Sequence, residues 1–315
     1  MAPLISVIIP VYKAEPFIKK CVRSLCNQSY ANYELIFIDD ASPDESVRII
    51  KEELSKYPEF ERKVKIIQNS ENLGVGPSRN LGLEIAAGEW CVFVDSDDWV
   101  STSFLENLIG RDFMDGDVII GGFVYEKEDS EEGVKRIFKD SENKICHIKA
   151  QELTCAIRYS LACGRLYDMK LIRRKLLRFE KIALHEDTLF FMRYLTVASR
   201  IVFRGCCDYH YIQYNTHSLS KKNRSPNEYK EISKLLLCAW DSLLHKLSHI
   251  NSYDIRGVVQ TYGLSQLLLA VQSQYLFYPS SKHERFALLA AVKSRRNLFL
   301  KSRRTASPLK KASIS

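Results

Sequence analysis

Short apolar runs alternate with longer segments of helical periodicity along the first hundred residues. The runs are rich in β-branched and aromatic residues, which favours buried strands, and they are Ile5–Pro10, Leu35–Ile38, Val64–Ile67 and Trp90–Val94. Between them, apolar residues recur at helical spacing after Pro16, after the Ser42-Pro43 pair and after Pro77. This alternation predicts an α/β fold with a mostly parallel sheet and right-handed crossovers.

The pattern is weaker in the second half. We expect a strand over 117–123, a polar hairpin or loop over 126–144, late strands near 201–203 and 209–214, and helices after Pro226. The predicted organisation is one α/β domain over residues 1–222, with a nucleotide-binding half of about 1–105 and an acceptor half of about 106–222. A helical region over 223–300 and a disordered basic tail over 301–315 would follow.

Acidic residues stand where two of the predicted strands end. Asp39 and Asp40 follow the second strand, and Asp95, Asp97 and Asp98 follow the Trp90 strand. Such acids could simply favour the start of the next helix, or they could hold a hard divalent cation together with the phosphates of a nucleotide. Parallel strands bring their carboxyl ends to one edge of a sheet. The capping interpretation does not predict this convergence, so we favour a ligand site there.

The segment Gly74-Val75-Gly76-Pro77-Ser78-Arg79 invites comparison with the dinucleotide-binding fingerprint. It lacks the third glycine, where Arg79 stands, and it follows the third strand instead of the first. A cation early in a helix fits contact with an anionic phosphate better, although a surface arginine is the plainer alternative.

Charge and cysteine content indicate which partners the protein binds and in which compartment it acts. The net charge of +8 lies entirely in the segment from Lys293 to the end, so residues 1–292 sum to zero and composition does not indicate a nucleic-acid binder. Nine scattered cysteines without a Cys-x-x-Cys pair, and a start without a secretion signal, predict a cytoplasmic protein with reduced thiols. The basic tail is either solvated or holds the protein on the inner face of the cell membrane.

Four motifs together resemble the family 2 glycosyltransferases of the GT-A fold. They are Ser6–Tyr12, Ile38–Asp44, Asn72–Gly82 and Asp95–Asp98, and their order and spacing match over about residues 4–105. Farther on, Cys163–Tyr167 and Phe179–Phe190 resemble the acceptor half of that family. Ala41 and Lys13 depart from its usual pattern, and Arg165 stands where many relatives have lysine.

The resemblance implies a role for several residues. By this resemblance, the nucleotide-sugar donor is bound by Pro10, Tyr12, Glu15, Asp40, Arg79, Asp95 and Ser96. On the same basis, Mn²⁺ or Mg²⁺ is bound by Asp97 and Asp95, with His217 as a candidate third ligand. The resemblance also makes Asp187 the general base and places Arg165 and Glu186 on the acceptor side. As alternatives from the residues themselves, Glu186 and Asp187 could only favour a helix start, and His217 could be a solvated loop residue.

The function that the resemblance implies is metal-dependent, inverting transfer of a sugar from a nucleoside diphosphate, UDP foremost. The acceptor would be a hydroxyl of a glycan or a polyprenyl-linked glycan in cell-surface polysaccharide assembly. A sugar-phosphate nucleotidyltransferase would carry a glycine-rich basic loop after the first strand, where this chain has Val11–Glu15. A non-catalytic nucleotide-binding protein is the third possibility, and it would be expected to have lost some of the acids.

Overall fold

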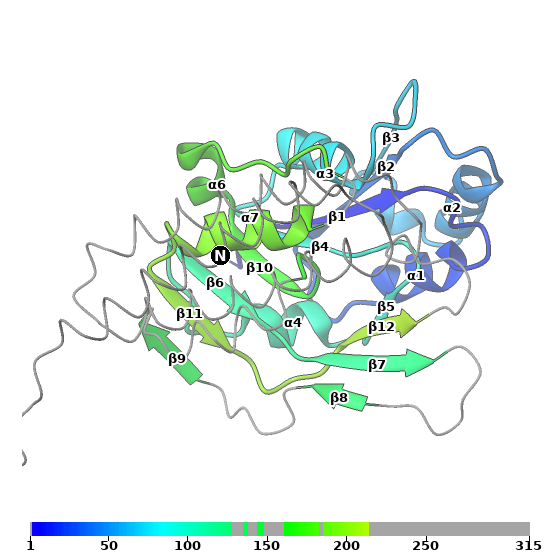
Figure 1. The fold of residues 1–315 in the computed structure, drawn as a ribbon. Helices are drawn as coiled ribbons and strands as arrows, with labels where there is room; N and C mark the ends of the chain where they lie inside the picture. The colour runs from blue at the N-terminus through cyan, green and yellow to red at the C-terminus, as the bar shows by residue number, and fades with distance from the viewer. Residues whose placement is uncertain (1, 128–134, 138–143, 148–160, 183–184, 214–315) are drawn as a thin grey trace, which may run out of the picture. The chain divides into compact units, whose positions relative to one another are not determined.

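Four parallel strands begin the central sheet of the computed structural model, which describes residues 2–127, 135–137, 144–147, 161–182 and 185–213 (Figure 1). They are β1 (Ile5–Val11), β2 (Tyr33–Asp39), β3 (Val64–Gln68) and β4 (Trp90–Phe93), in the order β3-β2-β1-β4. They are connected through α1 (Ile18–Cys26), α2 (Ser46–Leu54), a 3₁₀ turn (Pro58–Phe60) and α3 (Val75–Ile85). The predicted alternation is confirmed.

The sheet continues beyond β4 with strands of mixed direction. β10 (Arg165–Asp168) runs antiparallel to both β4 and β6 (Asp117–Ile120), and β11 (Arg200–Phe203) pairs in parallel with β6 and antiparallel with β9 (Lys144–His147). The other helices are α4 (Phe104–Ile109), α6 (Met169–Lys175) and α7 (Glu186–Leu195). Since β10 runs against β4, it begins at the edge where β4 ends.

The run predicted as a single strand over 117–123 is divided between two sheets. Only its first part is β6, and after Gly121-Gly122 the chain enters β7 (Phe123–Lys127) of a smaller sheet, with the order β5 (Trp99–Val100), β12 (Tyr209–Gln213), β7 and β8 (Lys135–Ile137). The amide of Gly121 donates to Gly164 O, and that of Gly122 donates to Cys206 O. The hydrophobic run is continuous because both of its parts are buried, so periodicity alone gives no sign of the break.

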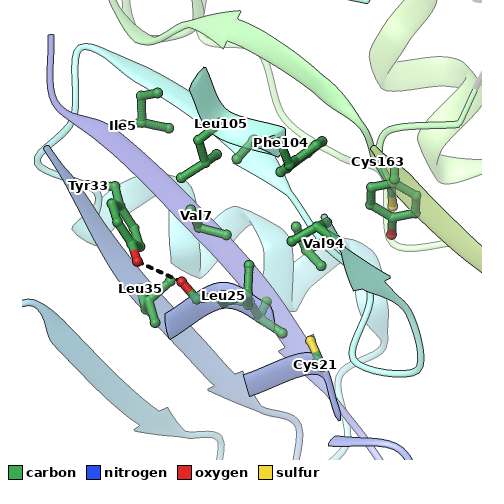
Figure 2. Packing of buried hydrophobic residues seen from close by; sticks show 14 of the residues in the cluster. Ile5, Val7, Cys21, Leu25, Tyr33, Leu35, Val94, Phe104, Leu105 and Cys163 are labelled. Atoms are coloured by element: carbon green, nitrogen blue, oxygen red, sulfur yellow. Dashed lines mark hydrogen bonds between the residues drawn. The ribbon is translucent and has the colours of Figure 1, made fainter. Parts of the chain in front are cut away.

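Helices cover both faces of the large sheet (Figure 1). Ile5, Val7 and Ile9 of β1 pack in one buried cluster with the apolar residues of α1 and α4. Figure 2 shows this packing, with the hydroxyl of Tyr33 donating to Leu25 O at 2.7 Å. Ile8 points to the opposite face, where α3 approaches so closely that a Cβ on Gly82 would overlap Ile8 Cγ2.

All described residues belong to one compact unit, made of residues 1–148 and 159–222. The predicted helical region over 223–300, the basic tail over 301–315 and His217 lie outside the described residues. Among the helices that the structure describes, none combines the length and the apolarity needed to cross a membrane.

Candidate active site

The residues predicted to bind the donor gather at one edge of the large sheet. β1, β2 and β4 run in parallel, so Tyr12, Asp40 and the acids 95–98 all follow strands that end at the same edge. Arg165 joins them because it is the first residue of the antiparallel strand β10. The sheet topology therefore brings donor-side and acceptor-side candidates together.

Asp40 is buried and uses its carboxylate to hold a loop of its own chain. Oδ1 accepts hydrogen bonds from Leu73 N and Asn69 Nδ2, both at 2.8 Å, and Oδ2 accepts from Gly74 N at 2.8 Å. This carboxylate fixes the loop between β3 and α3 at the edge of the site. Its predicted contact with the nucleotide stays a prediction.

The segments after β1 and β2 are joined to each other beside this loop. Lys13 and Ala41 both have a positive φ, of 53° and 55°, so the chain turns sharply after each strand. Glu15 Oε2 accepts from Glu45 N at 3.2 Å. Pro10 is buried within β1, whereas the Tyr12 side chain is exposed at the rim. The tyrosine ring is thus available to a ligand.

The three acids after β4 have different surroundings. Asp95 is held by two protein donors, since Arg79 Nη2 donates to Oδ1 at 2.8 Å and the Cys163 thiol donates to Oδ2 at 3.0 Å. Asp98 is buried, and its oxygens accept from the Tyr209 hydroxyl at 2.6 Å and Ile212 N at 2.9 Å. Asp97 is exposed. It is the acid of this group with the carboxylate most accessible to a ligand.

Asp97 and Asp98 also have shifted pKa values. Although part of the Asp97 residue reaches solvent, desolvation by the surrounding protein atoms and the negative charge of Asp95 raise the pKa of Asp97 to about 6. Burial raises the pKa of Asp98 well above its ordinary value, and the charges of Asp97 and Asp95 raise it further. Negative charge is therefore concentrated at this edge, and a bound cation would relieve the repulsion.

The residues predicted to serve the acceptor lie at the N-terminus of α7, so the predicted helix start is confirmed, whereas their role stays a prediction. Glu186 and Asp187 are the first two residues of this helix. Glu186 Oε1 accepts from Arg79 Nη1 at 3.0 Å, and Asp187 Oδ1 accepts from Thr188 N at 2.7 Å. Burial raises the pKa of Asp187, although the positive charge of Arg79 opposes the shift. The two neighbouring carboxylates thus have different partners, and Glu186 is the one bound to arginine.

The side chain of Arg165 packs against α7. It is fully buried, its guanidinium lies 3.8 Å from the centroid of the Phe191 ring, and within the described residues Nε, Nη1 and Nη2 have no hydrogen-bond partner. Burial lowers the pKa of Arg165, while the charge of Asp187 raises it. Arg165 is close enough to Asp187 for each charge to influence the other.

A family model shows to which family the chain belongs. The model described as "Glycosyl transferase family 2" matches residues 6–178, more than half of the 315 residues. The chain belongs to glycosyl transferase family 2.

Two curated relatives align with about two thirds of the chain. A poly(ribitol-phosphate) β-glucosyltransferase of Bacillus spizizenii is 31% identical over 216 residues, which are 66% of this chain and 32% of that protein. The glycosyltransferase GlyA of Streptococcus pneumoniae serotype 4 is 29% identical over 209 residues, or 63% of this chain and 29% of that protein. The chain thus spans about a third of the length of these relatives.

A solved structure confirms the fold. Residues 1–349 of TarS from S. aureus, in complex with UDP-GlcNAc, match with a TM-score of 0.69 over 92% of this chain and 81% of that chain, at 18% sequence identity. At this identity the likeness concerns the fold alone. The predicted GT-A architecture, with a mostly parallel sheet between helices, is therefore confirmed.

The donor set fits a hard divalent cation of the kind that the GT-A fold suggests. In the part of the chain that the structure describes, no group of three or more His, Cys, Asp or Glu side chains could by itself hold a metal ion. Mg²⁺ in nucleotide enzymes is commonly bound by one or two carboxylates, substrate phosphates and waters. The exposed Asp97 next to Asp95 meets that requirement.

The sequence does not predict that two further residues bond to Asp95, although one of them, Cys163, lies in a motif that resembles the acceptor half of the family. Cys163 and Tyr209 lie 68 and 114 positions from Asp95, yet the thiol of Cys163 donates to its carboxylate and the hydroxyl of Tyr209 accepts from its amide. In the sequence, Cys163 is one of nine scattered cysteines and Tyr209 one of sixteen tyrosines. Only the pairing of β10 and β12 into their sheets brings them to the acids.

Proposed function

We propose that this protein is an inverting glycosyltransferase that takes a sugar from a UDP-sugar and transfers it to a hydroxyl of a glycan or lipid-linked glycan. The observation that carries the proposal is the position of Arg79, which bonds both Asp95 on the donor side and Glu186 at the start of the acceptor-side helix. A transferase needs the two substrates in one place, and this arginine brings the two groups of acids together.

The roles of the residues follow from their surroundings. Asp97, the exposed acid, would hold Mg²⁺ or Mn²⁺, and the cation when bound would neutralise charge on the leaving diphosphate. Tyr12, Glu15 and the loop fixed by Asp40 would contact the nucleoside. Asp187 would accept the proton of the acceptor hydroxyl, which attacks the sugar from the face opposite the diphosphate. A raised pKa suits a base that operates near neutral pH.

Proteins of the same fold support the choice of donor and metal. TarS has been crystallised with UDP-GlcNAc and with UDP, and the distant mannosyltransferase PcManGT from Pyrobaculum calidifontis with GDP-Man and Mn²⁺. Two relatives are named as poly(ribitol-phosphate) glycosyltransferases, which supports a polymeric acceptor for this chain.

Thermal unfolding with a panel of UDP-, GDP- and dTDP-sugars in Mn²⁺ tests the proposal. A ligand at 100 times its Kd stabilises a folded protein by about 2.7 kcal/mol, so the donor should stand out by its increase in Tm. We expect UDP-sugars to give the largest shift and to release UDP slowly by hydrolysis. A panel without any shift or turnover would refute the function.

A further inference from the structure

The segment around Arg79, which resembles a phosphate-binding loop in sequence, faces another part of the chain. α3 lies against the stretch of residues 177–182 that leads toward α7 and Asp187. Gly76, Arg79 and Asn80 all contact this stretch or the start of α7, and we call these three residues the α3 dock. Their contacts are of three kinds.

Asn80 binds both backbone groups of one residue. Its Nδ2 donates to Phe179 O at 2.9 Å, and its Oδ1 accepts from Phe179 N at 2.8 Å. A side-chain amide carries a donor and an acceptor together, whereas a carboxylate carries only acceptors. The pair of bonds therefore requires an amide at this position.

Gly76 leaves room for the same stretch. A Cβ at this position would lie 2.5 Å from the carbonyl oxygen of Glu180, which is backbone and cannot move aside without moving the stretch. The glycine thus allows a close approach of two backbones, which is a different use from cradling a phosphate.

Arg79 completes the dock from a buried position. Its side chain is 4% exposed, and its two terminal nitrogens bond Asp95 and Glu186. Burial disfavours the charge, but the negative charges of Asp95, Glu186 and Asp187 together keep the pKa of Arg79 above its ordinary value. A guanidinium engaged in this way has little surface to offer to a phosphate.

The docked stretch is in turn packed against the helix that carries Asp187. The ring of Phe179 stacks on Phe190 of α7, with centroids 4.0 Å apart and an interplanar angle of 5°, and meets the edge of Phe93 of β4. A shift of Phe179 would therefore be transmitted to α7 through tightly packed aromatic rings.

We propose that the α3 dock positions the catalytic base. Gly76 and Asn80 fix residues 177–182 before α7, and Arg79 links Glu186 to Asp95 through its two ion pairs. Arg79 is then a positioning residue that acts through these two acids. The inference rests on the proposed function in one respect, the role of Asp187 as the base. If Arg79 positions the base, its loss should lower turnover without weakening donor binding. If Arg79 binds the phosphate, its loss should weaken donor binding.

Asn80→Asp is the sharpest test because it preserves shape. The new carboxylate can still accept from Phe179 N but has no proton to donate to Phe179 O. We expect kcat for hydrolysis of the best-stabilising UDP-sugar to fall at least about tenfold, since a small misplacement of a catalytic group costs up to about 10²-fold. The Kd of UDP with Mn²⁺, measured by calorimetry, should stay within about twofold.

Arg79→Lys and Arg79→Met extend the test to the ion pairs. Lysine keeps the charge but not the two-armed geometry, so kcat should rank wild type, then lysine, then methionine, with a UDP Kd that changes far less than kcat. If UDP affinity instead falls at least about tenfold in both variants while kcat at saturation is normal, Arg79 binds the phosphate and the inference is wrong.

Glu84→Gln is the matched control: Glu84 lies on the same helix and also meets the stretch, but only through a 3.9 Å ion pair with Arg178 between exposed side chains, and such exposed pairs contribute little. It should equal wild type in kcat, Kd and Tm. Thermal unfolding of each variant shows whether it is folded, and the conservative Arg79→Lys still decides if Asn80→Asp does not fold. A wild type without UDP affinity refutes the proposed function, whereas an active wild type with equally active dock variants refutes only the dock.

Discussion

At the scale of single residues, Asp187 is set apart from its neighbour by what surrounds it. Glu186 is bound to Arg79, while Thr188 N and Thr188 Oγ1 of the same helix donate to Asp187 Oδ1. Within the described residues, no hydrogen bond reaches Oδ2 of Asp187. In the proposed role, this oxygen would accept the proton of the acceptor hydroxyl.

Asp187→Asn keeps the shape of the side chain and removes the proton acceptor. Turnover should fall by about 10²–10⁴-fold while the Kd of UDP stays near wild type, which steady-state kinetics and calorimetry would measure. If Glu186→Gln abolishes turnover while Asp187→Asn keeps it normal, Glu186 is the base and Asp187 is not.

The pH dependence of the wild type should reflect the same residue. A base acts only when deprotonated, and burial raises the pKa of Asp187. Activity should therefore rise with pH through this raised pKa and level off above it. The profile of kcat, measured with saturating donor and Mn²⁺ so that the titration of Asp97 in the free protein does not enter, decides this. A profile that is flat from below pH 5 to neutral pH would contradict the assignment, since an ordinary aspartate titrates near pH 4.

Tyr209→Phe addresses stability at the acid cluster. The change leaves buried Asp98 without the hydroxyl that donates to it at 2.6 Å, and an unsatisfied buried polar group costs about 1–3 kcal/mol. Urea unfolding should show a loss of this size. Tyr211→Phe on the same strand, as control, should lose clearly less; equal losses would mean that the bond to Asp98 contributes nothing.

At the scale of elements, the first half of the fold could be predicted because each strand is an uninterrupted apolar run and each helix has its own periodicity. β1 to β4 and the edge where Asp40 and Asp95 stand follow from this alternation. The second half follows less well. β10 and β12 bring Cys163 and Tyr209 to Asp95 through pairings with distant strands, and no local pattern encodes those partners.

The packing of α3 on β1 offers a test at this scale. A Cβ on Gly82 would overlap Ile8 Cγ2, so Gly82→Ala should cost about 1–3 kcal/mol of stability, as overpacked cores do. Chemical denaturation measures the loss. Combined with Ile8→Ala, which removes the obstructing group, the double variant should lose less than the sum of the single losses. Strict additivity would show that the contact does not limit the packing.

At the scale of the whole molecule, the described residues do not explain the basic segment that runs from Lys293 through the tail over 301–315. Eight basic residues and no acidic residue lie between Lys293 and the end of the sequence. Each could add about 1 kcal/mol of attraction to an anionic membrane. We expect the full chain to co-sediment with phosphatidylserine vesicles at low salt and to be released at high salt. Equal binding by a chain ending at Glu284 would leave the tail without this role.

The proposed function requires that this member of family 2 bind a nucleoside diphosphate through a cation held at Asp97. Calorimetric titration of UDP into the wild type and Asp97→Asn, each with and without Mn²⁺, tests it most directly. We expect Mn²⁺ to strengthen UDP binding to the wild type. Asp97→Asn should remain folded, because Asp97 is exposed, and should lose most of this gain. An Asp97→Asn protein that binds UDP with the same Mn²⁺ dependence as the wild type would contradict the role of Asp97 in holding the cation.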